Sequence, residues 1–81
     1  MRSLRELLKE KNIGSLRTYT IAYNEVICAP NVVGYAFEDG VFIVYEVDER
    51  CRRSIVGKFQ NEEDAVNGAF RLIKAFYAFG R

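Results

Sequence analysis

Histidine and tryptophan are absent from the 81-residue chain, which also has a single proline and only two cysteines. Without histidine, the side chain that most often serves as a general base at neutral pH is missing. Two cysteines in one chain cannot form a tetrahedral zinc site of the usual kind. The sequence also has no glycine-rich phosphate loop and no carboxylates at calcium-ligand spacing. We therefore expect a protein that has no catalytic site, no cofactor and no bound metal.

Long apolar runs are missing as well. The longest, residues 41–45, is far shorter than the roughly 20 residues that span a bilayer. Charged side chains interrupt the N-terminal residues, which argues against a signal peptide. We therefore expect a cytoplasmic protein without membrane association. The length, with 49% hydrophobic and 28% charged residues, fits one globular domain over residues 1–81.

The two cysteines are Cys28 and Cys51. A cytoplasmic setting disfavours a disulfide between them, so we expect free thiols, with Cys28 partly buried. Cys51 lies between Arg50 and Arg52, and neighbouring cations can activate a thiol. The predicted position is an exposed turn with no group to orient a substrate, so we expect Cys51 to have no catalytic or redox role.

The first amphipathic helix is predicted near the N-terminus. Ser3 and Glu6 have the spacing of a capping box, which satisfies free backbone amides at a helix start. The leucines at positions 4, 7 and 8 share one helical face. We expect this helix to cover residues 4–12 and Gly14 to close it in the left-handed conformation.

The second amphipathic helix is predicted at the C-terminal end. Asn61 is a suitable N-cap, and the acidic residues 62–64 follow where the helix dipole favours negative charge. Apolar residues recur at helical spacing from Ala65 to Tyr77. Gly80 is expected to close this helix.

Between the helices, the apolar period changes to the alternation that is typical of strands. The predicted strands are Thr18–Tyr23, Val33–Phe37, Val41–Val47 and Arg53–Phe59, with residues 26–29 before Pro30 as a further candidate whose pairing stays open. Asp39-Gly40 favours a tight hairpin. The short connections predict no parallel pairing between neighbouring strands. The predicted fold class is α+β: an antiparallel sheet of three to four or five strands flanked by an N-terminal and a C-terminal helix packing on one face.

The predicted sheet is apolar on both faces. In its central strand one face holds Val41, Ile43, Tyr45 and Val47, and the opposite face holds Phe42 and Val44. Because two helices cover only one face, we expect an apolar and aromatic surface that binds a partner. Two alternatives stay open: this face forms a homodimer, or the sheet curls and buries it.

A basic cluster near the same strand suggests an alternative function. It consists of Arg50, Arg52, Arg53 and Lys58, with Phe42 and Tyr45 close by. Basic side chains beside aromatic rings on a sheet are typical of single-stranded nucleic-acid binding. The net charge of +1 and the absence of an RNA-recognition motif argue against this function.

Four segments between Asp39 and Phe76 form a more specific pattern. They are Asp39–Tyr45, Asp48-Glu49-Arg50, Gly57-Lys58-Phe59 and Glu62–Ala65. This pattern resembles a family of small immunity proteins from bacterial polymorphic-toxin systems. Members have a strand ending in aromatic residues, a Glu-Arg turn, a returning strand that ends in Phe, and a helix that opens with acidic residues followed by Ala. The turn usually continues with glycine, whereas this chain has Cys51.

The resemblance implies a non-catalytic inhibitor that is made beside its toxin and held against it without covalent bonds. It also implies toxin contacts at Tyr45, Glu49 and Arg50, with a core position as the alternative for Tyr45. The candidate partner-binding residues are therefore Tyr45, Glu49, Arg50, Phe42, Arg52 and Arg53. The alternatives to an immunity protein are a small nucleic-acid-binding module and a self-associating structural domain.

Overall fold

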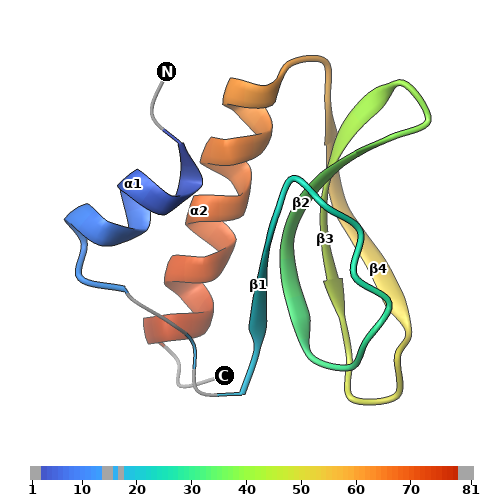
Figure 1. Cartoon of the computed structure of the whole chain (residues 1–81), viewed down its shortest axis with the longest axis horizontal. Helices are drawn as coiled ribbons and strands as arrows, with labels where there is room; N and C mark the ends of the chain where they lie inside the picture. The colour runs from blue at the N-terminus through green and yellow to red at the C-terminus, as the bar shows by residue number, and fades with distance from the viewer. Residues whose placement is uncertain (1–2, 14–15, 17, 79–81) are drawn as a thin grey trace.

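The computed structural model describes residues 3–13, 16 and 18–78, in which a central sheet separates two helices from an irregular segment (Figure 1). The elements are α1 (Leu4–Glu10), β1 (Thr20–Tyr23), β2 (Val32–Glu38), β3 (Val41–Val47), β4 (Arg53–Phe59) and α2 (Glu62–Ala78). α2 packs on one face of the sheet, and α1 packs against α2 on the same side. The predicted α+β class, with helices on one face, is confirmed.

The first helix starts at the predicted capping box. The Glu6 amide donates to Ser3 Oγ at 3.2 Å, and the Ser3 amide donates to Glu6 Oε1 at 3.3 Å. The helix ends at Glu10, earlier than predicted, and Asn12 adopts the left-handed conformation with φ of 59°. Asparagine tolerates this conformation better than most residues do. Gly14, which we expected in that role, lies outside the described residues.

The second helix begins as predicted. Asn61 Oδ1 accepts a hydrogen bond from the Asp64 amide at 2.9 Å, so Asn61 is its N-cap. Gly80, the expected closing residue, is not among the described residues. Within the part of the chain that the structure describes, neither helix combines the length and the apolar character needed to span a membrane.

The described sheet contains four strands in the order β1-β2-β3-β4. The pairs β2–β3 and β3–β4 are antiparallel, as predicted. Asp39 and Gly40 form the β2–β3 hairpin loop with φ of 53° and 82°, positive values that match the twist of a two-residue hairpin. The sequence therefore identified this meander correctly.

The pairing of β1 with β2 is parallel, so the expectation that short connections exclude parallel neighbours was wrong. Residues 24–31, here called the crossover segment, pass over the sheet face opposite the helices (Figure 1). Asn24 and Asn31, at its two ends, have positive φ of 52° and 58°. Asn31 also accepts a hydrogen bond from the Thr20 amide at 2.8 Å, which joins the end of the segment to the start of β1. Residues 26–29 of the segment form no strand.

The two faces of the sheet each carry an apolar core. The helix-side core contains Leu4, Leu8, Ile13, Leu16, Val33, Tyr35, Val44, Ala65, Val66, Ala69, Ile73 and Phe76. The opposite core contains Ala22, Val32, Ala36, Ile43, Tyr45 and Val47, with Ile27, Ala29 and Val41 packed against it. The crossover segment therefore covers the face that we expected to be left for a partner. For this face, internal burial is the correct alternative.

Tyr45 holds the crossover segment in place. Its side chain is fully buried, and its hydroxyl donates to the Glu25 carbonyl at 2.8 Å. The same hydroxyl accepts a hydrogen bond from the Ile27 amide at 3.1 Å. Burial raises the pKa of Tyr45, because an apolar environment disfavours the charged phenolate. Tyr45 is therefore a core residue, which was the alternative to its role as a partner contact.

We expect Tyr45→Phe to lower the free energy of unfolding by about 1–3 kcal/mol, because it leaves backbone groups of Glu25 and Ile27 without their partner. Urea denaturation measures this change. Tyr77→Phe is the matched control, since the Tyr77 side chain is 50% exposed. Equal stability of the two variants would contradict the role of the Tyr45 hydroxyl.

A second tyrosine connects the sheet to α2. The Tyr35 hydroxyl donates to Glu62 Oε2 at 2.9 Å. Burial, the hydrogen bond to Glu62 and the charge of Glu62 together raise the pKa of Tyr35 to about 12. A group whose pKa is higher in the folded state than in the unfolded state stabilises the fold, and this contribution is complete at pH values below its unfolded pKa. That contribution is lost as the pH rises from 10.0, the ordinary value, through about 12.

We expect the free energy of unfolding to fall between pH 10.0 and about pH 12 as this contribution of Tyr35 is lost. Tyr35→Phe should show a smaller fall over the same range, together with a stability loss of about 1.5 kcal/mol at neutral pH. Urea titrations at a series of pH values provide both quantities. Tyr77→Phe should keep the full fall, and an identical pH profile for Tyr35→Phe would refute the assignment.

Candidate partner-binding surface

The six predicted contact residues do not form one continuous surface. Tyr45 is in the core, and Phe42 is half-buried on the helix side, with its ring centroid 4.8 Å from that of Phe37. The other four lie together, in the β3–β4 turn and at the start of β4: Glu49, Arg50, Arg52 and Arg53. The turn and the start of β4, and not the central strand, therefore place predicted contact residues at the surface.

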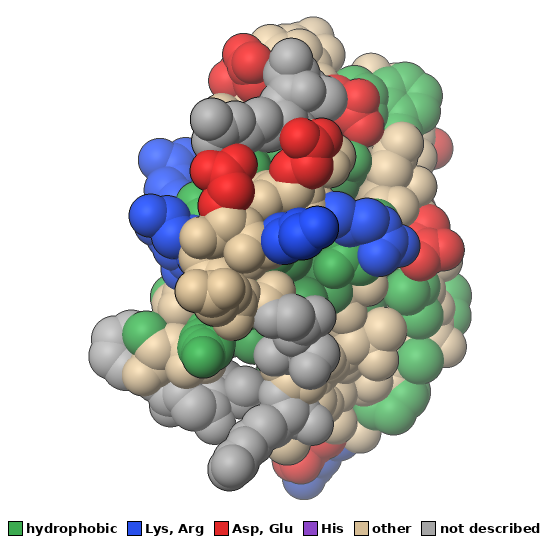
Figure 2. Space-filling view, turned by 60° about the vertical axis from the view of Figure 1, so that its left-hand side comes forward, with side chains coloured by type: hydrophobic (Ala, Val, Ile, Leu, Met, Phe, Trp, Pro, Cys, Tyr) green, Lys and Arg blue, Asp and Glu red, His purple; other side chains and the backbone are tan. Residues whose placement is uncertain are grey.

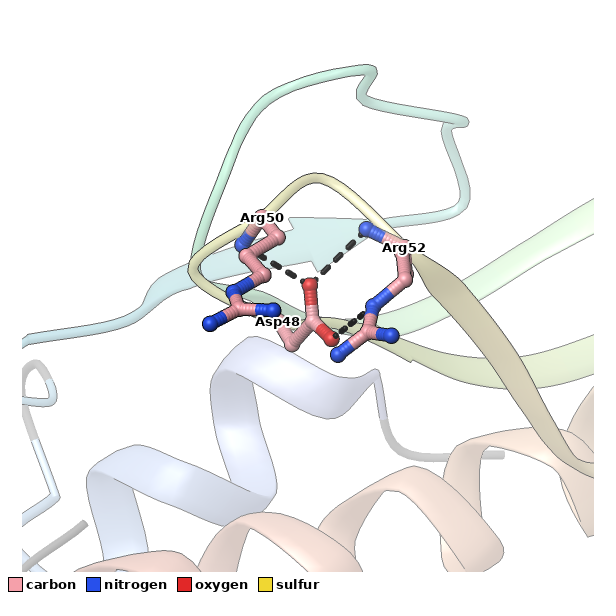
Figure 3. A network of polar contacts seen from close by, with 3 residues as sticks. All are labelled: Asp48, Arg50 and Arg52. Atoms are coloured by element: carbon pink, nitrogen blue, oxygen red, sulfur yellow. Dashed lines mark hydrogen bonds and ion pairs between the residues drawn. The ribbon is translucent and has the colours of Figure 1, made fainter.

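The carboxylate of Asp48 organises this turn. Its Oδ1 accepts hydrogen bonds from the amides of Arg50 at 2.8 Å and Arg52 at 2.9 Å, and its Oδ2 accepts one from Arg52 Nε at 3.0 Å. Figure 3 shows the two guanidinium groups on either side of the carboxylate. The hydrogen bond from the Arg52 amide is the main reason why the pKa of Asp48 is lowered. The fold gains stability from this carboxylate above its unfolded pKa and loses it on acidification.

Cys51 occupies the position in the turn where a glycine is usual. Its amide donates to the Asp48 carbonyl at 3.1 Å, the Asp48 amide donates to the Arg52 carbonyl at 3.0 Å, and Cys51 has φ of 62°. This is the pattern of a turn followed by a left-handed residue, the usual form of a short hairpin loop with a bulge. Cys51 therefore keeps this turn but places a side chain in a strained conformation.

We expect Cys51→Gly to raise the free energy of unfolding by about 0.5–1 kcal/mol, because glycine adopts positive φ at little cost. Cys51→Ala is the matched control: it removes the thiol but keeps the strained backbone. Thermal and urea denaturation of both variants separate the two effects. A gain of the same size in Cys51→Ala would show that the thiol, and not the backbone, limits stability.

Arg53 is held by an ion pair within the chain. Its Nη2 and Nη1 lie 2.9 and 3.0 Å from the two carboxylate oxygens of Glu38, a two-point geometry that favours arginine. Since Glu38 ends β2 and Arg53 starts β4, the pair spans β3, which separates these strands. The hydrogen bond from Arg53 is the main cause of the lowered pKa of Glu38. This ion pair therefore joins the two strands on either side of β3.

The basic residues do not form the surface that nucleic-acid binding requires. Arg52 and Arg53 each pair with a carboxylate. Of the two aromatic rings proposed for stacking, the ring of Tyr45 is buried and the ring of Phe42 is half-buried. On the helix-bearing side, Figure 2 shows Lys and Arg side chains directly beside acidic ones. A broad basic surface with accessible rings is typical of such proteins. The alternative of a nucleic-acid-binding module gains no support from the described residues.

Among the described strand residues, β4 carries two exposed large apolar side chains, and Phe37 of β2 is a third at 55%. β4 lies at one edge, and residues 53–56 are all exposed, including Ile55 at 43% and Val56 at 54%. Tyr45 pairs with Ile55, whereas Val44 pairs with Gly57, so Val56 is the extra residue of a β-bulge. The bulge breaks the alternation of the strand and brings two adjacent apolar side chains to the surface.

A shallow groove of about 380 Å³ lies beside Val56, between β4 and α2. Its lining residues are Val44, Val56, Gly57, Phe59, Gly68, Arg71, Leu72 and Ala75. A Cβ atom at Gly57 or Gly68 would lie 3.0–3.1 Å from the ring of Phe59, so both glycines make room for that ring. We call residues 53–59 together with this groove the β4 surface. The sequence did not reveal it, although the adjacent Ile55 and Val56 were the available sign.

Both cysteines are free and exposed, so the expected partial burial of Cys28 was wrong. Across the described residues, no group of three or more His, Cys, Asp or Glu side chains is arranged to hold a metal ion.

Comparison with known proteins gives no match among protein-family models, curated proteins or solved structures. The resemblance to immunity proteins therefore stays a prediction.

Proposed function

We propose that the chain is a non-catalytic immunity protein that binds and neutralises a cognate bacterial toxin in the cytoplasm of the producing cell. The observation that carries the binding function is the exposed apolar pair Ile55 and Val56 on an edge strand, beside a groove. The identity of the partner as a toxin rests on the resemblance of the segments between Asp39 and Phe76 to immunity proteins.

The β4 surface suits a partner that docks along a strand edge. An edge strand offers unpaired backbone N–H and C=O groups, to which an extended segment of another protein can add as a further strand. The groove beside Val56 can receive an apolar side chain of that segment. The bulge interrupts the ladder at the same place, which limits unselective pairing with other strands.

The β3–β4 turn supplies polar contacts at one end of the same surface. Glu49 and Arg50 are exposed, and Asp48 holds the backbone around them through the hydrogen bonds described above. Preorganised polar groups lose less conformational entropy on binding than mobile ones do. With a net charge of +1, the protein would block its toxin by covering it, because it does not have the strong negative charge that mimics a nucleic acid.

We expect Val56→Lys to weaken binding to the toxin about 30-fold or more, the effect of losing a central apolar anchor. Tyr77→Lys is the matched control, since it introduces the same side chain at an exposed apolar position of α2 outside the groove. Growth of cells that express the neighbouring open reading frame, with each variant, gives the protection, and calorimetry gives the affinity. Circular dichroism checks that both variants fold.

Wild-type protein that neither rescues growth nor binds the neighbouring gene product would refute the immunity function. Rescue by the wild type with equal loss in both variants would refute the β4 surface as the contact site. Rescue that both variants retain would move the contact to another surface.

A self-associating structural domain is the second candidate, favoured by the same free edge. Antiparallel pairing of two β4 strands centred on Val56 would oppose Arg53 to Phe59 and Ser54 to Lys58. This arrangement brings no like charges together. Sedimentation velocity of the isolated chain decides the matter, because a monomer at every concentration removes this candidate.

A further inference from the structure

Cys28 and Cys51 are far apart in the sequence but line the same cavity. This cavity has a volume of about 340 Å³, and its wall also includes Val47 and the ion-paired residues Glu38 and Arg53. Cys28 belongs to the crossover segment and Cys51 to the β3–β4 turn, and both side chains are exposed. The fold thus places both cysteines in the wall of one cavity, where both residues are exposed.

A shared hydrogen-bond acceptor holds the two thiol-bearing segments together. The Asp48 carbonyl accepts hydrogen bonds from the Asn31 amide at 3.2 Å and from the Cys51 amide at 3.1 Å. Next to Cys28, the Ile27 amide is fixed by the hydroxyl of Tyr45. The backbone at Cys51 and the backbone next to Cys28 are therefore each held by a hydrogen bond.

Arg53 places a positive charge in the wall of the same cavity. The pKa of Arg53 is raised, mainly by its hydrogen bond to Glu38, and electrostatic interaction with Cys28 adds to this effect. Arg53 and both cysteines thus line one cavity.

We propose that Cys28 and Cys51 are a redox pair that a small-molecule disulfide converts into an intramolecular disulfide bond. One thiolate attacks the small disulfide, forms a mixed disulfide and releases one small thiol. The other thiolate then attacks the protein sulfur of the mixed disulfide, which forms the bond between Cys28 and Cys51 and releases the second small thiol. Two electrons and two protons pass from the protein to the two released thiols.

The disulfide would tie the crossover segment directly to the β3–β4 turn. In a reducing cytoplasm such bonds are usually transient and serve redox sensing or catalysis. Oxidation would therefore stiffen the turn that carries Glu49 and Arg50 when the cell is under oxidative conditions. This inference does not depend on the proposed function, since the chemistry needs no partner protein.

The test uses the reduced full chain, incubated with oxidised glutathione and then alkylated. We expect a monomer that is lighter by two hydrogen atoms in intact-mass spectrometry and that takes up no alkylating reagent. Its melting temperature should rise by about 10 °C relative to the reduced chain, because the bond closes a long loop. Cys28→Ser and Cys51→Ser should each stop at an adduct with one glutathione.

Three outcomes would overturn the proposal. The first is a wild-type chain that carries two glutathione adducts, and the second is a disulfide-linked dimer as the main product. The third is a folded chain whose two thiols stay free under conditions that oxidise the chain unfolded in urea. The unfolded sample is the control for the oxidising conditions. None of these readouts involves a toxin, so failure here leaves the proposed function untouched.

Discussion

The fold depends on the two hydrogen bonds that the Tyr45 hydroxyl makes with residues 25 and 27. Irregular backbone can cover an apolar sheet face only where its polar groups find partners, because a buried unpaired N–H or C=O is costly. Tyr45 supplies a donor and an acceptor at the centre of that face. This allows the crossover segment to lie flat over the second core, which in turn places β1 parallel to β2 and brings Cys28 to the β3–β4 turn.

Local signals in the sequence were sufficient for the helices and the meander. The capping box at Ser3, the N-cap at Asn61 and the Asp39-Gly40 hairpin all act within a few residues. The crossover segment could not be predicted in this way, because its ends are turn residues and its middle reads as a short strand. One sign was present: a Cβ at Gly34 would clash with the carbonyl oxygen of Ala22, so glycine marks a close approach of β1 and β2.

The candidate site was predicted only in part, for a related reason. The position of Arg50 in an exposed turn followed from turn chemistry. Alternation shows that a strand is apolar on both faces, but it does not show which face the rest of the chain covers. Tyr45 was therefore mistaken for a contact. Val56 was missed because of the β-bulge, which shifts the alternation of β4 by one residue. The regular alternation therefore did not predict that the Val56 side chain is exposed.

The parallel pairing of β1 imposes an order on the assembly of the chain. Hairpins β2–β3 and β3–β4 join neighbours in sequence, so they close short loops and form through local contacts. β1 pairs with β2 only through the crossover segment, which lies over Tyr45 of β3. We therefore expect the N-terminal strand to join the sheet after the meander has formed. Loosening of residues 24–31 would release that strand while the hairpins stay intact, so partial opening of this protein begins at its first strand.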